Sequence, residues 1–182
     1  MYIFSISTDS DEKETGWNLF DSDNTKVMCS GSLSAPKNIS FIKRSIILTD
    51  SLKYIMGNLI KYINTVCIEE IYYRTNTRKI TDLIKLNGIY TYMIYKEFNI
   101  LSVLVKPYDW ISYFNLNTIK DSSDRHYYVI KKINEILNLN TDSVSETYSI
   151  LISYYYSCLI KGVKESWIDN QNITASTTMS KN

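Results

Sequence analysis

The sequence has little glycine, proline, cysteine and histidine: its 182 residues contain five Gly, two Pro, three Cys and one His. A chain this poor in glycine is expected to have few tight turns or phosphate-binding loops. The three cysteines are widely spaced and form no Cys-x-x-Cys pair, which together with a single histidine argues against a zinc site. We expect reduced thiols in the cytoplasm.

The sequence also lacks an excess of either charge and a long hydrophobic run. Its 20 Lys and Arg against 19 Asp and Glu give a formal net charge of +1 at pH 7, which excludes a polybasic protein that binds nucleic acid through bulk charge alone. No run of about 18 apolar residues is present, so neither a transmembrane helix nor a membrane partner is expected. The N-terminal segment lacks the basic start of a signal peptide.

Hydrophobic residues make up 45% of the chain and charged residues 21%, a balance typical of a folded globular domain. Tyrosine is unusually frequent, with 16 copies, and it accompanies many Ile, Asn and Lys residues. All four are encoded by AT-rich codons, which indicates a genomic contribution to this bias. We expect a single domain over residues 1–164 and a flexible polar tail over 165–182.

Hydrophobic periodicity predicts one α/β domain. Short apolar runs predict strands at 2–8, 16–20, 26–33, 65–72 and 100–105. Apolar residues at helical spacing predict helices at 41–63, 78–98, 108–114, 122–138 and 142–160. The first three strands are expected to form an antiparallel meander. The alternation of helices and strands that follows predicts a mixed sheet flanked by helices.

Acidic residues lie at the ends of two predicted strands. Asp9 follows the first strand, and Glu69 lies near the end of the fourth. If these strands are neighbours, the two carboxylates converge at one edge of the sheet, where they repel each other unless a divalent cation neutralises them. Asp142 and Glu146, four residues apart in the last predicted helix, would add further acids. Two bound metal ions would activate water and stabilise the leaving oxygen in phosphodiester hydrolysis.

Two motifs have the spacing of a known nuclease family. Asp9 is followed by Thr15-Gly16-Trp17, so that an aromatic residue lies eight positions after the acid. Glu69 is followed by Asn76 and Gly88, at offsets of seven and nineteen residues. These offsets resemble those of the RuvC-type Holliday junction resolvases, of the RNase H-like superfamily, in which the two acids end the first and fourth strands.

The resemblance continues through about residues 2–160. Leu83 to Gly88 is similar to the Leu-x-x-x-x-Gly pattern of the family's next helix. Residues 105–110, with the sequence VKPYDW, are similar to the VKPxxW motif of phage-borne members, and Lys120 follows at the start of a helix. The resemblance implies an α/β, RNase H-like fold of the RuvC type, with a mixed five-stranded sheet flanked by helices.

The resemblance also implies a function and a set of site residues. The function is that of a structure-selective endonuclease, of phage or viral origin, which resolves branched DNA by metal-dependent phosphodiester hydrolysis as a homodimer. The acids expected to bind one or two Mg²⁺ or Mn²⁺ ions are Asp9, Glu69, Asp142 and Glu146. Lys106 is expected to join them in catalysis. The residues expected to contact DNA are Arg74, Asn76, Arg78, Lys79, Lys106 and Lys120.

The last helix departs from the family, in which two acids three residues apart open it. If Glu146 takes the second acid position, Ser143 takes the first. If the helix is aligned by its apolar run instead, Ser145 and Tyr148 take both positions and both acids are lost. The alternative function is therefore a catalytically degenerate RNase H-fold protein that binds DNA or a protein partner. An α/β scaffold without a nucleic-acid role is the third hypothesis.

Structural roles remain open for several residues. Asp9 lies in an acidic stretch that also suits a turn, and Ser143 to Glu146 also matches a helix capping box. Glu70 is expected at the surface, on the opposite face of its strand from Glu69. His126 is interpreted as a surface or packed residue. Residues 154–156, three consecutive tyrosines, cover nearly every face of a helix, so they predict core packing, with a base-stacking platform as the alternative.

Overall fold

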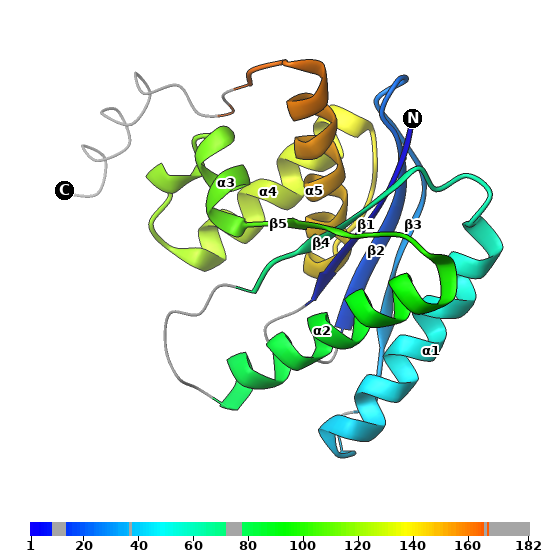
Figure 1. The fold of residues 1–182 in the computed structure, drawn as a ribbon. Helices are drawn as coiled ribbons and strands as arrows, with labels where there is room; N and C mark the ends of the chain where they lie inside the picture. The colour runs from blue at the N-terminus through cyan, green and yellow to red at the C-terminus, as the bar shows by residue number, and fades with distance from the viewer. Residues whose placement is uncertain (9–13, 37, 72–77, 166, 168–182) are drawn as a thin grey trace, which may run out of the picture.

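A computed structural model describes residues 1–8, 14–36, 38–71, 78–165 and 167, and it contains a sheet between two layers of helices (Figure 1). The strands are β1 (Tyr2–Thr8), β2 (Glu14–Asp21), β3 (Lys26–Ser34), β4 (Thr65–Glu69) and β5 (Val103–Val105). The helices are α1 (Phe41–Leu59), α2 (Arg78–Phe98), α3 (Pro107–Tyr113), α4 (Ser122–Leu137) and α5 (Val144–Lys161), with a 3₁₀ turn η1 at Leu116–Thr118.

The sheet has the strand order β3-β2-β1-β4-β5. β1 pairs antiparallel with β2, which pairs antiparallel with β3, so the predicted meander is confirmed. β1 pairs parallel with β4, and β4 pairs parallel with β5. The predicted mixed five-stranded sheet is therefore also confirmed. Because β1 and β4 are parallel neighbours, their C-terminal ends meet at the same edge of the sheet.

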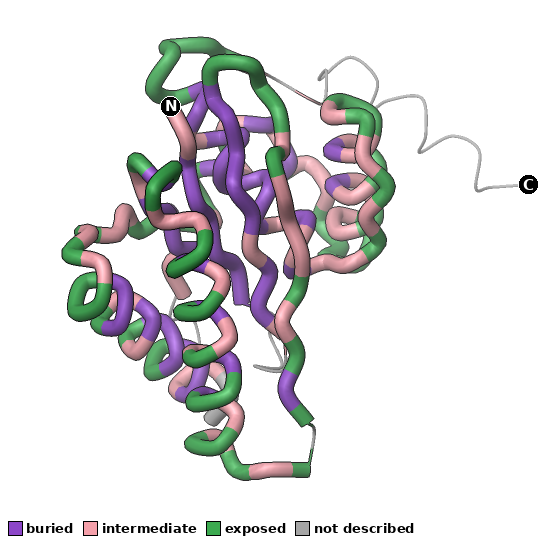
Figure 2. The backbone as a smooth tube through the Cα atoms, turned by 90° about the vertical axis from the view of Figure 1, so that its right-hand side faces the viewer, coloured by how far each residue is buried: buried purple, intermediate pink, exposed green. Residues whose placement is uncertain are grey.

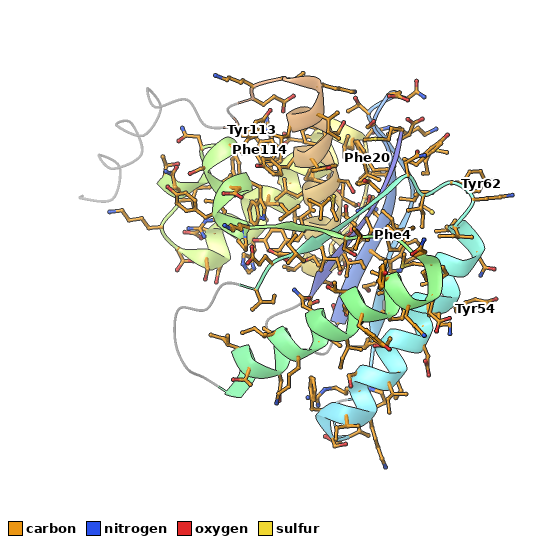
Figure 3. All side chains as sticks on the ribbon, viewed as in Figure 1. Phe4, Phe20, Tyr54, Tyr62, Tyr113 and Phe114 are labelled. Atoms are coloured by element: carbon orange, nitrogen blue, oxygen red, sulfur yellow. The ribbon has the colours of Figure 1, made fainter. Side chains whose placement is uncertain are left out.

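Each face of the sheet carries its own hydrophobic core, since successive side chains of a strand point to opposite faces. Ile3, Phe20 and Cys67 pack against α3, α4 and α5. Phe4 and Ile68 lie on the other face, against α1 and α2. Figure 2 shows the buried strands at the centre of the molecule, and Figure 3 shows Phe20 and Phe4 on opposite sides of the sheet.

Helix α5 lies directly on the sheet because the residues at the contact are small. A Cβ atom on Gly16 of β2 would lie 1.9 Å from the carbonyl oxygen of Ser145. The buried serines of α5 repeat every four residues, which places them on one side of the helix: Ser145, Ser149, Ser153 and Ser157. Ser153 is hydrogen-bonded to Ser5 of β1, and its Oγ donates to Asn18 Oδ1 of β2 at 3.0 Å.

Two described residues beyond position 164, Glu165 and Trp167, contact the helical layer of α3, α4 and α5. Trp167 stacks on Phe114, with 4.1 Å between the ring centroids. Its backbone carbonyl accepts a hydrogen bond from Tyr128 Oη at 2.8 Å. Tyr154 Oη donates to the Glu165 carboxylate at 2.8 Å. Residues 168–182 lie outside the described part of the chain.

Element boundaries differ from the sequence predictions by a few residues. The strand predicted at 100–105 forms only at Val103–Val105, and the helix predicted at 41–63 ends at Leu59. α5 begins at Val144 because Ser143 is its N-cap, with its side chain accepting a hydrogen bond from the Glu146 backbone N–H. Cys29, Cys67 and Cys158 are free thiols. None of the described helices is long and apolar enough to cross a membrane.

Candidate functional site

A cavity of about 220 Å³ opens where β1 and β4 end and α5 begins. The strands contribute polar and acidic side chains to its wall, and the helices contribute aromatic, imidazole and hydroxyl groups. Its lining residues are Ser7, Thr8, Glu69, Glu70, Ile71, Leu83, Pro107, His126, Val144, Ser145 and Tyr148. We call this cavity the Glu69 pocket. It lies where the sequence predicted the acidic site, at the edge shared by the first and fourth strands.

Glu69 is the buried acid of this pocket, with 9% of its surface exposed. Its Oε2 accepts a hydrogen bond of 2.5 Å from Ser7 Oγ, across from β1. Its backbone carbonyl accepts a bond of 2.6 Å from Asn87 Nδ2 of α2. Burial raises the pKa of Glu69 to about 7, although the Ser7 bond acts in the opposite direction. A cation bound in the pocket would favour the ionised carboxylate.

Helix α5 presents Ser145 and Tyr148 to the Glu69 pocket. These two residues are three positions apart, and they are the pair that takes the acid positions when the helix is aligned by its apolar run. The Tyr148 ring packs against Trp110 and His126, with centroid distances of 5.3 Å to each. Burial and the charge of Glu69 both raise the pKa of Tyr148. The α5 side of the pocket is therefore lined by a serine and a tyrosine rather than by acids.

The Glu146 carboxylate is bonded on the β3 side of the sheet and does not line the Glu69 pocket, and its role as a metal ligand stays a prediction. Its carboxylate accepts hydrogen bonds from Ser30 Oγ of β3 at 2.6 Å and from Thr141 Oγ1 at 3.1 Å. β3 and β4 are separated by β2 and β1, a span of about 14 Å at the usual spacing of strands. The packing of α5 on Gly16 fixes this direction, because it turns the Ser145 side of the helix toward the sheet.

Asp142 does not line the Glu69 pocket either, and its role as a metal ligand likewise stays a prediction. It precedes the N-cap of α5, its side chain is exposed, and it does not line the pocket. The predicted capping role of Ser143 is present in the structure, at 3.3 Å from Ser143 Oγ to the Glu146 backbone nitrogen. The helix start thus accounts for the sequence pattern that suggested a pair of acids.

Lys106 lies beside the Glu69 pocket rather than in it. It is exposed, and it lines a groove of about 700 Å³ between α3 and α4. The residue after it, Pro107, lines both the groove and the pocket, so the two are neighbours. Lys120 is exposed in the turn before α4. The structure brings Lys106 close to the predicted site and does not place Lys120 in its lining.

Several predicted site residues lie outside the described part of the chain: Asp9, Arg74 and Asn76. Asp9 is the residue after Thr8, which lines the Glu69 pocket. Arg78 and Lys79 open helix α2, but their side chains are not described. Their roles therefore stay predictions.

Three residues that line the pocket were not predicted as site residues, whereas the predicted core packing of the three-tyrosine motif is confirmed. Ser7 was visible only as the polar end of a strand, and His126 was interpreted as a surface or packed residue. Tyr148 was visible only in the second alignment of the last helix. In the three-tyrosine motif, Tyr154 and Tyr155 are buried at 5% and 8% exposure, which excludes them as a base-stacking platform.

The described residues do not provide the four-acid metal centre that the resemblance implies. No group of three or more His, Cys, Asp or Glu side chains able to hold a metal ion occurs in the described ranges. The pocket does provide a buried carboxylate, Glu69, and the hydroxyls of Ser7 and Ser145, which are oxygen donors of the kind that Mg²⁺ and Mn²⁺ accept. These donors fit a divalent cation, and the part played by Asp9 stays a prediction.

No protein-family model matches the sequence, and no curated protein is similar to it at the level of sequence. The structure, by contrast, is similar to solved resolvases. It matches RuvC of Thermus thermophilus in complex with a Holliday junction substrate, with a TM-score of 0.69, 8% identity, and coverage of 91% of this chain and 98% of that one. A second Thermus thermophilus RuvC structure gives a TM-score of 0.65 at 10% identity, covering 91% and 99%.

A viral enzyme shows the same likeness at lower similarity. The Holliday junction resolvase of fowlpox virus matches with a TM-score of 0.50 and 16% identity, over 88% of this chain and 99% of that one. Identities this low establish the architecture and not the activity. Together with the strand order and the two helical layers, these similarities show that the chain has a RuvC-like, RNase H-like α/β fold.

Proposed function

We propose that this protein is a metal-dependent, structure-selective endonuclease that acts on branched DNA such as Holliday junctions. The observation that carries the proposal is the Glu69 pocket, in which a buried carboxylate with a raised pKa lies beside the end of β1. In our proposal Glu69 and Asp9 hold one Mg²⁺ or Mn²⁺ ion. Such an ion would lower the pKa of a bound water and stabilise the leaving oxygen of a phosphodiester.

The protein's own residues hold the substrate and the acid in place. Ser7 and Asn87 fix the side chain and backbone of Glu69 from β1 and α2, so its carboxylate needs little reorganisation when charge develops nearby. Lys106, in the adjoining groove, supplies a positive charge for a DNA phosphate. The similar Thermus thermophilus protein was solved with a Holliday junction, which supports branched DNA as the substrate class.

We further propose that the protein acts as a homodimer. A two-fold axis would place two Glu69 pockets in equivalent positions on the two halves of a four-way junction. Two exposed aromatic residues of α2, Tyr92 and Tyr95, are available on its outer side. Sedimentation equilibrium of the full chain, with and without a four-way junction, would measure this association.

A cleavage assay tests the proposed activity. Purified protein is incubated with an end-labelled four-way junction and with a duplex of the same sequence, in Mg²⁺ or Mn²⁺. We expect paired nicks in opposed strands of the junction, no cleavage of the duplex, and loss of nicking in Glu69→Gln. The matched control is Glu97→Gln, which neutralises a surface carboxylate of α2 paired with Lys53 at 2.8 Å. Equal nicking by Glu69→Gln would overturn the proposal.

A second candidate function is binding of branched DNA without cleavage. The specific observation in its favour is that Ser145 and Tyr148 occupy the α5 side of the pocket while the Glu146 carboxylate is bonded to Ser30 and Thr141. The same assay separates the two candidates. Junction binding in a gel-shift experiment, with no nicks in either metal, would establish the binding function in place of the nuclease.

A further inference from the structure

The groove that adjoins the Glu69 pocket has its own chemistry. It measures about 700 Å³ and lies between α3 and α4, and its lining residues are Lys106, Pro107, Tyr108, Asp109, Ile111, Asn117 and Arg125. We call it the Tyr108 groove. Because Pro107 lines both cavities, the groove is directly beside the Glu69 pocket and within reach of DNA bound there.

The Tyr108 groove is lined by an exposed aromatic ring and by two cationic groups. Tyr108 is 63% exposed, although it belongs to a helix whose Trp110 is buried at 2%. Lys106 is exposed two residues before it, and Arg125 faces the same groove from α4. Exposed aromatic rings flanked by cations form the sites at which proteins stack the bases of unpaired nucleic acid.

Arg125 connects the groove to the pocket. Its Nη2 donates a hydrogen bond of 2.6 Å to the Ile119 carbonyl, which fixes the direction of the guanidinium. Its charge also acts on Tyr148, a lining residue of the Glu69 pocket: burial raises the pKa of Tyr148, and Arg125 partly offsets this rise. A phosphate between pocket and groove would therefore lie near a positive charge held in place by the fold.

The charge balance of the groove indicates that attraction of phosphates is not its main contribution. The Asp109 carboxylate offsets one of the two cations, Lys106 and Arg125, and leaves one net positive charge. Phosphate attraction grows with the number of cations that face the backbone, so it is modest here. The aromatic surface of Tyr108 thus offers the larger interaction, and it suits a base rather than a phosphate.

We propose that Tyr108 stacks on an unpaired base next to the phosphodiester held at the Glu69 pocket, and that this contact makes the protein prefer branched DNA over duplex. The inference rests on the proposed function, because it assumes that branched DNA enters the pocket. A base inside a continuous duplex has both faces covered by its neighbours, so the phenol ring cannot stack on it. At a branch point a base can be exposed, and the ring of Tyr108 then covers it.

The experiment compares variants of Tyr108 in the full chain. Binding is measured with Ca²⁺ in place of Mg²⁺, on a four-way junction that carries 2-aminopurine at each central position in turn, and on the matching duplex. For Tyr108→Leu we expect an affinity for the junction about 5- to 100-fold weaker, unchanged affinity for the duplex, and loss of 2-aminopurine quenching at one position. Tyr108→Phe should keep both the affinity and the quenching. The matched control is Tyr127→Leu, which removes an exposed ring of α4 (73%) that does not line the groove.

The outcomes separate this inference from the proposed function. If the unsubstituted protein shows no preference for the junction, the proposed function fails and the inference fails with it. If the protein prefers the junction and Tyr108→Leu binds it equally well, the inference is overturned while the proposed function stands. An equal loss of duplex and junction affinity in Tyr108→Leu would also overturn it, because the ring would then not be selective for a branch point. Thermal melting of each variant shows whether it is folded.

Discussion

Gly16 of β2 lies directly beneath the backbone of Ser145 in α5, at a distance that leaves no room for a Cβ atom. This contact sets the rotation of α5 about its axis. It turns Ser145 and Tyr148 toward the Glu69 pocket and turns Glu146 toward Ser30. The close contact at Gly16 therefore decides which side chains of α5 line the candidate site.

Substitution of Gly16 by alanine should displace α5 from the sheet. The new Cβ would meet the Ser145 carbonyl oxygen at 1.9 Å and the Glu146 nitrogen at 2.4 Å, and both are backbone atoms that cannot move alone. We expect a loss of 3 kcal/mol or more in the free energy of unfolding, at or above the upper end of the usual ~1–3 kcal/mol for overpacking, measured by urea denaturation.

Gly88→Ala is the matched control for this glycine substitution. It lies inside α2, where a Cβ would meet nothing within 4 Å, so alanine should stabilise the protein by about 0.5–1 kcal/mol. A loss of similar size in both variants would show that the tight contact between β2 and α5 is not the cause.

The architecture could be predicted from the sequence, whereas the rotation of the last helix could not. β1 and β4 consist of short apolar runs, and α2 repeats its apolar residues at helical spacing, so local patterns were sufficient. In α5 the serines and the acids alternate with apolar residues on several faces, and local patterns allowed two alignments. The choice between them depends on a contact with Gly16, 129 residues away in the chain, which no local pattern contains.

The position of the acidic site could likewise be predicted, and its composition only in part. Glu69 could be predicted as a site residue because it is an acid in an otherwise apolar strand, and a buried carboxylate without a partner is costly. Its partner Ser7 could not be recognised, since a serine at a strand end has no distinctive pattern and its bond to Glu69 depends on the pairing of β1 with β4. The aromatic and imidazole wall depends on the docking of α4 on α5 in the same way.

The stability of the protein should fall as Glu69 ionises. Burial raises its pKa from 4.5 to about 7 in the folded state, so the folded form holds this proton more tightly than the unfolded chain. The stabilisation that comes from protonated Glu69 is complete below pH 4.5, and it is lost as the pH rises to about 7. The full shift corresponds to about 3 kcal/mol, measured without metal as the free energy of unfolding relative to Glu69→Gln between pH 4 and pH 8.

A divalent cation should reverse this loss if it binds at Glu69. Addition of Mn²⁺ at pH 8 should raise the melting temperature of the unsubstituted protein, because the ion binds the folded state and pairs with the ionised carboxylate. Glu69→Gln should gain little. Parallel pH profiles for the two proteins, or an equal Mn²⁺ effect on both, would contradict the assignment of the raised pKa and of the metal ligand to this residue.

Trp167 should stabilise the fold although it lies beyond the last helix. Its ring stacks on Phe114 at 4.1 Å, and its backbone accepts a bond from Tyr128 and donates one to the Phe114 carbonyl. Trp167→Ala should lower the free energy of unfolding by about 2–3 kcal/mol, less than the ~3–5 kcal/mol typical of a buried tryptophan, because the ring is only partly buried. Trp167→Phe should recover most of this loss, and unchanged stability in the alanine variant would show that the segment does not dock in solution.

Glu146 provides the sharpest test of the rotation of α5, since the two alignments assign it opposite roles. In the structure its carboxylate holds Ser30 of β3 and Thr141 in place, at 2.6 and 3.1 Å. Glu146→Ala should therefore cost about 1–3 kcal/mol of stability, the usual range for hydrogen bonds to a half-buried charged group, while Mn²⁺ affinity by calorimetry and junction cleavage stay unchanged. Glu69→Gln should show the opposite profile, with metal affinity and cleavage lost and stability above pH 7 increased. If Glu146→Ala instead loses metal affinity and keeps its stability, the helix in solution presents its acid to the site. Glu146 would then be a third acid of the proposed metal centre, beside Glu69 and Asp9.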